Sequence, residues 1–442
     1  MNIEDNHKVV IVGGGFGGLY AAKELGKNNN YKITLIDKRN FHLFQPLLYQ
    51  VATGGLSPGD IASPLRAILK KRKNTSVIRG KVTDIIPDKK EVILKDGEIL
   101  NYDTLIVATG VIYNYYGNDL WLGVSPPLKT MEDSLGIRHR IFQAFEEAER
   151  QTDLEKQNEW LRFIIIGAGP TGVELAGALS ELAHFTLKNN FRNFDPKYTK
   201  IILIEATDRV LPTYPDKLSK SAEKSLLKLG VTIKKNSFVT EIKDNSVLLT
   251  SNGNSENIKA KTILWAAGVK ATRIGDVLKN RFNVNCDKVG RVYVNEDLTI
   301  NDRKDVFVIG DLALFTHQDG KPLPGVAPVA MQQGKYVAKL LNNRIKDINT
   351  LPFKYKNKGS LAVIGRNKAV ADLGYLKFNG FFAWLIWAFI HIRYLIEYDN
   401  KVLVMLQWGW YYLTMKKGAR LITGDDPFPY VDKDYYDQTK DN

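Results

Sequence analysis

Short apolar runs alternate with helix-forming segments along most of this 442-residue chain. The runs at 9–12 (VVIV) and 163–166 (FIII) contain no polar residue, which is typical of strands that are buried on both faces. Each run leads into a glycine-rich turn and then into a helix-forming run. We therefore predict an α/β fold with two Rossmann-like dinucleotide-binding domains.

The first glycine-rich turn has the spacing Gly13-x-Gly15-x-x-Gly18. Its glycines would allow a tight turn, a close approach of the backbone to a pyrophosphate, and close packing of helix on strand. The next predicted strand ends in Asp37, an acid at the position that binds a ribose hydroxyl. His42 can equally be a structural histidine, and Lys38 and Arg39 can equally be solvated. Further cofactor-binding candidates in this part are Gly14, Phe16, Gly17, Lys38, Arg39, His42 and Val82.

The pattern recurs at Gly167-x-Gly169-x-x-Gly172, followed by a strand that ends in Glu205. This acid lies further from its glycines than usual, because 185–198 reads as an insertion. A carboxylate here would accept bonds from a free 2′-hydroxyl and repel a 2′-phosphate, so the second site favours NAD over NADP. Pro170 and Thr171 complete the second set of candidates.

Three later strands end in small-residue turns, at 102–110, 262–269 and 305–313. Singly, each is equally an ordinary buried strand, but their ordered recurrence favours two cofactors that face each other. Asp311 would lie by a flavin ribityl chain. The remaining candidates are Ala108, Thr109, Gly110, Ala267, Gly268 and Gly310.

The order of these motifs predicts a discontinuous first domain. We expect an FAD-binding domain at 1–120 and 296–354, an NADH-binding domain at 121–295 between its two parts, and a C-terminal membrane-association region at 355–442.

The most apolar stretch is 381–396 (FFAWLIWAFIHIRYLI). As a helix it would reach about 24 Å, which is short of the roughly 30 Å hydrocarbon core. Tryptophans and tyrosines gather between 384 and 412, and these side chains favour the membrane–water boundary. We predict an amphipathic anchor, paired with 402–415, that lies in one leaflet. The alternative is a core or dimer helix.

Composition narrows the class of protein. The apolar content of 44% and the charged content of 25% are typical of a globular protein. The net charge of +14 suits an anionic membrane surface, and the absence of a nucleic-acid motif argues against nucleic acid. The single cysteine, Cys286, excludes an intrachain disulfide, and no metal-binding spacing is present. The N-terminus has no secretory signal pattern, so we expect no export.

Several segments resemble the type II NADH:quinone oxidoreductase family of two-dinucleotide-binding flavoproteins. They are 40–66, 167–182, 323–341, 358–366 and 418–424. The resemblance implies non-covalent FAD, NADH as electron donor, a membrane quinone as acceptor, and no proton pumping. It also implies peripheral attachment to the cytoplasmic face of the cell membrane; a homodimer is a further expectation. The disulfide reductases and sulfide oxidisers of the superfamily need at least two cysteines.

Other acceptors remain alternatives at this point. A soluble NADH oxidase or a ferredoxin-type reductase would share both glycine turns but lack the apolar C-terminal part. A flavin-bearing binding or signalling protein would use NADH only as a ligand.

The resemblance also implies two catalytic residues. Glu174 matches the family's glutamate beside the nicotinamide and the quinone path, although it can also simply favour its helix N-terminus. Gln332 matches the second glutamine of the family's Ala-Gln-x-x-x-Gln motif, which includes Ala330 here, and is our candidate for the flavin–quinone junction; the alternative is a plain polar residue at a helix start. Pro328 replaces the first glutamine, which leaves the quinone type open.

Overall fold

The computed structural model describes residues 6–243, 245–396, 398–414 and 417–422. Contacts between Cα atoms divide the chain into two compact units. Unit 1 comprises Met1–Leu43, Ala62–Ile112 and Val269–Lys358. Unit 2 comprises Phe44–Ile61, Tyr113–Gly268 and Gly359–Asn442. Each unit is built around its own parallel sheet, so the predicted α/β fold with two Rossmann-like parts is confirmed.

Unit 1 contains a six-stranded sheet in the order β20-β21-β9-β1-β2-β5. All neighbours are parallel except β20 and β21. The apolar run Val9–Val12 lies in its buried centre, as its lack of polar alternation predicts. These strands are β1 (His7–Val12), β2 (Tyr31–Asp37), β5 (Thr75–Arg79), β9 (Thr104–Val107), β20 (Thr299–Ile300) and β21 (Arg303–Val308).

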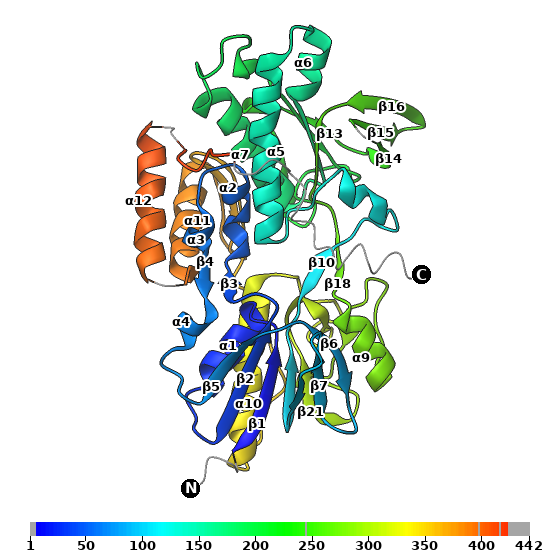
Figure 1. Cartoon of the computed structure of the whole chain (residues 1–442), viewed down its shortest axis with the longest axis vertical. Coiled ribbons are helices and arrows are strands. Elements are labelled where there is room, and N and C mark those ends of the chain that lie inside the picture. The colour runs from blue at the N-terminus through cyan, green and yellow to red at the C-terminus, as the bar shows by residue number, and fades with distance from the viewer. Residues whose placement is uncertain (1–5, 244, 397, 415–416, 423–442) are drawn as a thin grey trace. The chain divides into compact units, whose positions relative to one another are not determined.

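Two helices of unit 1 pack closely together, α1 (Phe16–Leu25) and α10 (Ala327–Ile345) (Figure 1). A Cβ added to Gly334 on α10 would lie 2.3 Å from the Gly17 carbonyl oxygen on α1, so only glycine permits this approach. The other elements include β3 (Phe41–Leu43), β4 (Ala62–Pro64), α4 (Leu65–Leu69), β6 (Val82–Ile86), β7 (Glu91–Leu94), β8 (Ile99–Asn101), β18 (Val269–Ala271), α9 (Ile274–Phe282), β19 (Val292–Tyr293), η6 (Gly310–Leu312) and β22 (Ala313–Leu314).

Unit 2 contains a four-stranded parallel sheet in the order β13-β12-β11-β17. An antiparallel sheet, β14-β15-β16, follows β13 in the chain. The strands are β11 (Arg162–Ile166), β12 (Lys200–Ile204), β13 (Val231–Lys234), β14 (Phe238–Lys243), β15 (Ser246–Ser251), β16 (Asn254–Lys259) and β17 (Thr262–Trp265). The helices before the C-terminal part include α2 (Leu48–Ala52), α3 (Pro58–Ile61), α5 (Met131–Arg150), α6 (Leu154–Trp160), α7 (Pro170–Glu181) and α8 (Asp216–Lys228).

The C-terminal part adds a small antiparallel sheet and two helices to unit 2. The sheet consists of β23 (Ser360–Gly365), β24 (Lys368–Asp372) and β25 (Lys377–Asn379). A Cβ on Gly177 of α7 would lie 1.7 Å from the Ile364 carbonyl oxygen, so α7 and β23 are in backbone contact. This close packing joins the C-terminal sheet to the helix that carries Glu174.

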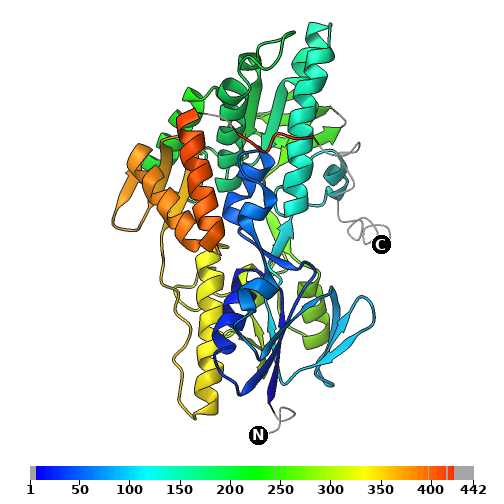
Figure 2. The same ribbon diagram turned by 60° about the vertical axis from the view of Figure 1, so that its left-hand side comes forward.

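The predicted helix pair is present as α11 (Gly380–Tyr394) and α12 (Tyr398–Thr414), which lie side by side (Figures 1 and 2). The Trp387 and Trp408 rings stack 5.1 Å apart between them. Trp387 is only 2% exposed, so part of the aromatic cluster predicted for the membrane boundary instead lies inside the unit. Within the described ranges, no helix combines the length and apolarity needed to span a bilayer.

The observed units differ from the domain boundaries expected from the sequence. Residues 269–295 group with unit 1, whereas 44–61 and the C-terminal part group with unit 2. The reason is packing: α2 contacts α5 and α7, and α11 contacts β23 and β24. The acidic tail 425–442 lies outside the described residues.

Candidate functional site

The first glycine turn joins β1 to α1 and forms an open cradle. Gly13 has φ +105°, and a Cβ there would lie 2.4 Å from the Ala108 carbonyl oxygen. A Cβ on Gly18 would lie 1.9 Å from the Gly13 oxygen. At Gly15, by contrast, a Cβ would meet no atom within 4 Å. Two glycines therefore close the turn, and the third leaves a free face at the positive end of α1 for a pyrophosphate.

Two side chains hold this turn in place. Asp37 at the end of β2 accepts hydrogen bonds from the N–H groups of Gly14 (2.6 Å) and Arg39 (2.7 Å). Burial raises the pKa of Asp37, and these two N–H groups oppose that effect. His42 is buried, and its Nδ1 donates to the Gly14 carbonyl at 2.9 Å while Phe16 packs edge-on against its ring.

Burial lowers the pKa of His42 to about 4, so this histidine is neutral at physiological pH. Its Nε2 is buried without a hydrogen-bond partner. His42 could be a cofactor contact or a structural histidine, and its hydrogen bond to the Gly14 carbonyl favours a structural role in holding the turn.

A second turn in unit 1 carries Gly310 and Asp311. Gly310 has φ +74°, and its N–H donates to the Gln333 side chain at 2.6 Å. Ala330, one turn before Gln333 on α10, lies against Gly310. Gln333 was not among the residues selected from the sequence, but it is 1% exposed and fixes the turn that carries Asp311. The open cradle at Gly15 and the acid at Asp37 fit an FAD, which these residues would hold with Asp311.

Gln332 occupies a different environment from its neighbour. Its amide donates to the Lys356 carbonyl and accepts from the Lys356 N–H, both at 2.9 Å. The sequence suggested that Gln332 lies just before a helix. Instead, the helix α10 begins at Ala327, so Gln332 lies inside it. Pro328 occupies the first turn of α10, where a missing N–H costs little. Both polar ends of the Gln332 amide thus anchor the 356 segment, and its place at a flavin–quinone junction stays a prediction.

The second glycine turn, in unit 2, repeats the geometry of the first. Gly167 has φ +100°, and a Cβ on Gly172 would lie 1.8 Å from the Gly167 carbonyl oxygen. Gly169 again faces open space at the start of α7. Pro170 and Thr171 are the first two residues of that helix.

Glu205 stands directly after β12, next to this turn. Its carboxylate accepts hydrogen bonds from the Ala168 N–H at 2.7 Å and from the N–H and hydroxyl of Thr207 at 2.9 Å. Ala168 occupies the same place in its turn as Gly14 in the first, so Glu205 corresponds to Asp37. The insertion does not displace it, because the rings of Phe191 and Phe194 stack on Phe145 of α5 and hold the inserted segment on the helix.

We expect Glu205→Gln to weaken discrimination between NADH and NADPH. Glutamine keeps an acceptor for the Ala168 N–H but removes the negative charge that repels a 2′-phosphate. The kcat/KM for NADH should fall about tenfold, a loss of about 1.4 kcal/mol, while that for NADPH should rise. Steady-state ferricyanide reduction measures both values. Glu241→Gln, at a partly exposed site on β14, is the control, and an unchanged NADH/NADPH ratio in Glu205→Gln would contradict this role.

The remaining candidates lie beside the two turns or at nearby strand ends. Thr109 shares a 2.7 Å hydrogen bond with the Thr272 hydroxyl in unit 1. Gly268, at φ +71° in unit 2, is close to the Tyr116 hydroxyl. The other candidates are located by the elements that carry or precede them. They are Gly17 on α1, Lys38 after β2, Val82 on β6, Ala108 and Gly110 after β9, and Ala267 after β17.

Glu174 lies on α7, one turn inside the helix that the second glycine turn begins. Its carboxylate accepts a hydrogen bond from the Val363 N–H at 3.4 Å. Burial raises the pKa of Glu174 to about 8, so the acid is mostly protonated at neutral pH. Such a group can give up a proton near physiological pH.

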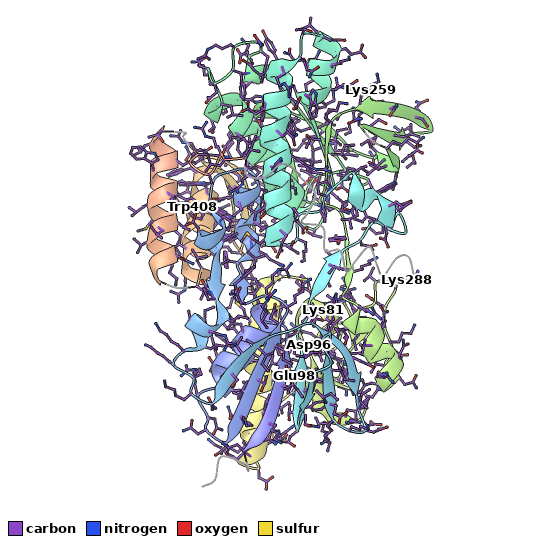
Figure 3. All side chains as sticks on the ribbon, in the orientation of Figure 1. Lys81, Asp96, Glu98, Lys259, Lys288 and Trp408 are labelled. Carbon is purple, nitrogen blue, oxygen red and sulfur yellow. The ribbon has the colours of Figure 1, made fainter. Side chains whose placement is uncertain are left out.

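Glu174 lines a cavity of about 80 Å³ within unit 2. The cavity also receives side chains from α2, α11 and α12 and from the segment that follows α12. Trp408 on α12 is marked in Figure 3. The members used below are Tyr49, Glu174, Glu181, Trp387, Trp408 and Lys417. Glu181, Lys417 and Tyr49 were not selected from the sequence, although the spacing of Glu174 and Glu181 on one helix could have paired them.

Within the described ranges, no three His, Cys, Asp or Glu side chains gather closely enough to hold a metal ion.

Comparison with known proteins identifies the family. Residues 7–334 match the family model of the pyridine nucleotide-disulphide oxidoreductases, and residues 357–415 match the model of the NDH2 C-terminal domain. The chain is 42% identical over 432 residues to the type II NADH:quinone oxidoreductase Ndh of Mycobacterium tuberculosis (strain ATCC 25618 / H37Rv), covering 96% of this chain and 91% of that protein.

Two further matches agree. NdhA of the same organism, also a type II NADH:quinone oxidoreductase, is 41% identical over 94% of this chain and 89% of its own length. The solved structure of NDH2 from Plasmodium falciparum in complex with NADH shares the fold, with a TM-score of 0.84 at 22% identity over 95% of this chain and all of that one. The chain therefore belongs to the type II NADH:quinone oxidoreductase family, as its sequence motifs predicted.

Proposed function

We propose that this protein transfers a hydride from NADH to a non-covalent FAD and two electrons on to a membrane quinone, without pumping protons. It would work as a peripheral protein on the cytoplasmic face of the cell membrane. The M. tuberculosis relatives named for this activity, and the NDH2 structure solved with NADH, support the proposal. Two cradles of the same design, one in each unit, provide for two dinucleotides.

One observation carries the quinone part of the proposal. Glu174 lies on the helix that the NADH cradle begins, and it lines the same cavity as Trp387 and Trp408 of the apolar C-terminal helices. A lipid-soluble acceptor that enters along α11 and α12 would therefore approach the end of unit 2 where the nicotinamide is expected. The alternative acceptors, oxygen or a ferredoxin, give no reason for apolar helices at this place.

The protein's contribution is binding, placement and proton supply. Backbone N–H groups at the start of α1 and of α7 would bind the two pyrophosphates, and Asp37 and Glu205 would bind the ribose hydroxyls. A bound flavin supplies the hydride acceptance and electron transfer. Glu174 holds a proton in its neutral form and would release it to a quinone oxygen as that oxygen gains electrons. Gln332 and the Gly310–Asp311 turn would keep the flavin side of unit 1 in position.

Anaerobic absorption spectroscopy tests both halves of this scheme. Stoichiometric NADH should bleach the flavin band of the FAD-loaded protein, and an added quinone should restore it. A flavin band that NADH bleaches but quinone does not restore would reject the quinone and favour one of the other acceptors.

The outward faces of α11 and α12 support attachment to a membrane surface. Large apolar side chains on them are strongly exposed, among them Phe382 (70%), Phe389 (67%) and Leu406 (62%). Lys377 and Arg393 beside them are exposed cations, which suit anionic headgroups. A homodimer contact through this surface stays an alternative prediction.

Replacing Phe382, Phe389 and Leu406 together by serine should detach the protein from vesicles. Each side chain contributes about 2 kcal/mol when buried in lipid, so binding should fall at least a hundredfold. Sedimentation with phosphatidylglycerol vesicles measures this. The control replaces three exposed leucines outside these helices, Leu120, Leu154 and Leu227, by serine. Equal binding by both triple variants would show that α11 and α12 are not the membrane surface.

A further inference from the structure

One face of α7 carries two glutamates, Glu174 and Glu181, that line the same cavity. Glu174, Ala178 and Glu181 follow each other at intervals of four and three residues, which places them in a row along the helix. Glu181 is 7% exposed. One of its carboxylate oxygens accepts from the Arg366 N–H at 2.5 Å, and the other accepts from the Tyr411 hydroxyl at 3.1 Å.

A buried lysine contacts the middle of this row. Lys417, in the segment after α12, is 6% exposed, and its Nζ donates to the Ala178 carbonyl at 3.2 Å. Ala178 is the middle residue of the α7 row. Lys417 Nζ also lies 5.4 Å from the centre of the Tyr411 ring. Gly418, the next residue in the chain, is exposed, so the backbone that carries Lys417 reaches the surface directly after it.

The cavity is of the right size for water. Its volume of about 80 Å³ exceeds the roughly 10–15 Å³ that one water needs, and at about 30 Å³ for each molecule it accommodates two or three waters. Its lining carboxylates, lysine and tyrosines offer the polar partners that such waters need. The space is smaller than the roughly 150 Å³ of a cavity that holds benzene, so a quinone ring fits into it only if the lining side chains move.

We propose that Lys417, positioned by Glu181 and Tyr411, returns a proton to Glu174 through water in this cavity after each quinone reduction. The inference rests on the proposed function and assigns its proton route.

The proton balance requires such a supply. NADH, one proton and a quinone give NAD⁺ and a quinol, so the hydride brings two electrons and one proton, and the second proton comes from the medium. Glu174 loses its O–H proton to the quinone oxygen and becomes a carboxylate. The Lys417 ammonium then gives a proton by way of water to that carboxylate, and the resulting amine takes one from solvent.

The titration properties suit a transfer in either direction. Burial lowers the pKa of Lys417 to about 8, against a smaller opposing effect of Glu181, and the pKa of Glu174 is also raised to about 8. The other ionisable groups that face these residues are tyrosines and one arginine. Burial raises the pKa values of Tyr49, Tyr214 and Tyr411, so these tyrosines stay protonated; Tyr412 and Arg366 complete the set.

The test compares Lys417→Met and Lys417→Arg with wild type, using the FAD-loaded protein, NADH and ubiquinone-1. At pH 8 both variants should lose about tenfold in quinone-dependent kcat with little change in KM, because neither side chain can release a proton. Ferricyanide reduction, which consumes no proton at the acceptor, should stay at the wild-type rate. Added imidazole should restore much of the lost quinone rate by donating protons into the cavity.

Three controls separate the outcomes. Lys259→Met, at an exposed site marked in Figure 3, should behave as wild type. Lys417→Arg keeps the positive charge beside Glu181, so its melting temperature should stay closer to that of wild type than the melting temperature of Lys417→Met does. A variant rate that imidazole leaves unchanged, an equal loss with ferricyanide, or full quinone activity in both variants would overturn the relay. A wild-type protein that reduces no quinone would instead reject the proposed function.

Discussion

Gly172→Ala should abolish NADH oxidation and destabilise unit 2. The new Cβ would lie 1.8 Å from the Gly167 carbonyl oxygen, a backbone atom that can move only if β11 and α7 separate. Forced overpacking of this kind costs about 1–3 kcal/mol and sometimes more. We expect NADH-dependent ferricyanide reduction to fall at least a thousandfold and the melting temperature to drop, while the flavin stays bound to unit 1.

Gly169→Ala is the matched control for this prediction. Gly169 has an extended backbone, with φ −69° and ψ −176°, and a Cβ there meets no protein atom within 4 Å. The variant should melt as wild type does, but its KM for NADH should rise at least tenfold, because the methyl occupies the face that a dinucleotide must approach. If Gly169→Ala and Gly172→Ala both bound NADH as tightly as wild type does, the second turn would not be the NADH site.

Glu174→Gln should lower quinone-dependent turnover by about a hundredfold, the usual contribution of a general acid. Glutamine keeps an acceptor for the Val363 N–H but cannot supply a proton. Ferricyanide reduction should change little, because NADH oxidation itself needs no proton from this residue. Steady-state assays with the two acceptors measure the difference. Glu223→Gln on α8, whose carboxylate pairs with Lys235, is the control.

The same variant makes a prediction about stability. A folded-state pKa near 8, raised from 4.5, means that the acid's contribution is fully present below pH 4.5 and is lost as pH rises through 8. Glu174→Gln should therefore be more stable than wild type at pH 9, by roughly 2–3 kcal/mol in urea unfolding, and the gap should close at pH 5. A gap that does not depend on pH would mean that Glu174 is ionised at neutral pH.

The two cradles could be predicted because everything that forms them is local. Strand, glycines and helix are contiguous, and the acid at the end of the neighbouring parallel strand lies at the same edge of the sheet. This is why Glu205 was found despite the insertion before it: β12 still pairs with β11, and the insertion packs elsewhere on α5. The length of 381–396 likewise predicted a helix that cannot span a bilayer.

What the sequence missed depends on contacts between distant segments or on one helix boundary. Placing Gln332 just before a helix hid the fact that Gln333 faces inward on a helix that begins at Ala327. Lys417 and Glu181 are far apart in the chain, and only the packing of the C-terminal segment on α7 brings them together. Trp387 was assigned to the membrane boundary because aromatic composition does not say which face of a helix is covered.

The most direct test of the central claim is quinone reduction by the purified, FAD-loaded protein under anaerobic conditions. With NADH and menadione or ubiquinone-1, we expect one quinol for each NADH oxidised, at a rate far above that with NADPH. Oxidation of NADH with ferricyanide but with neither quinone, at any concentration up to solubility, would contradict the account.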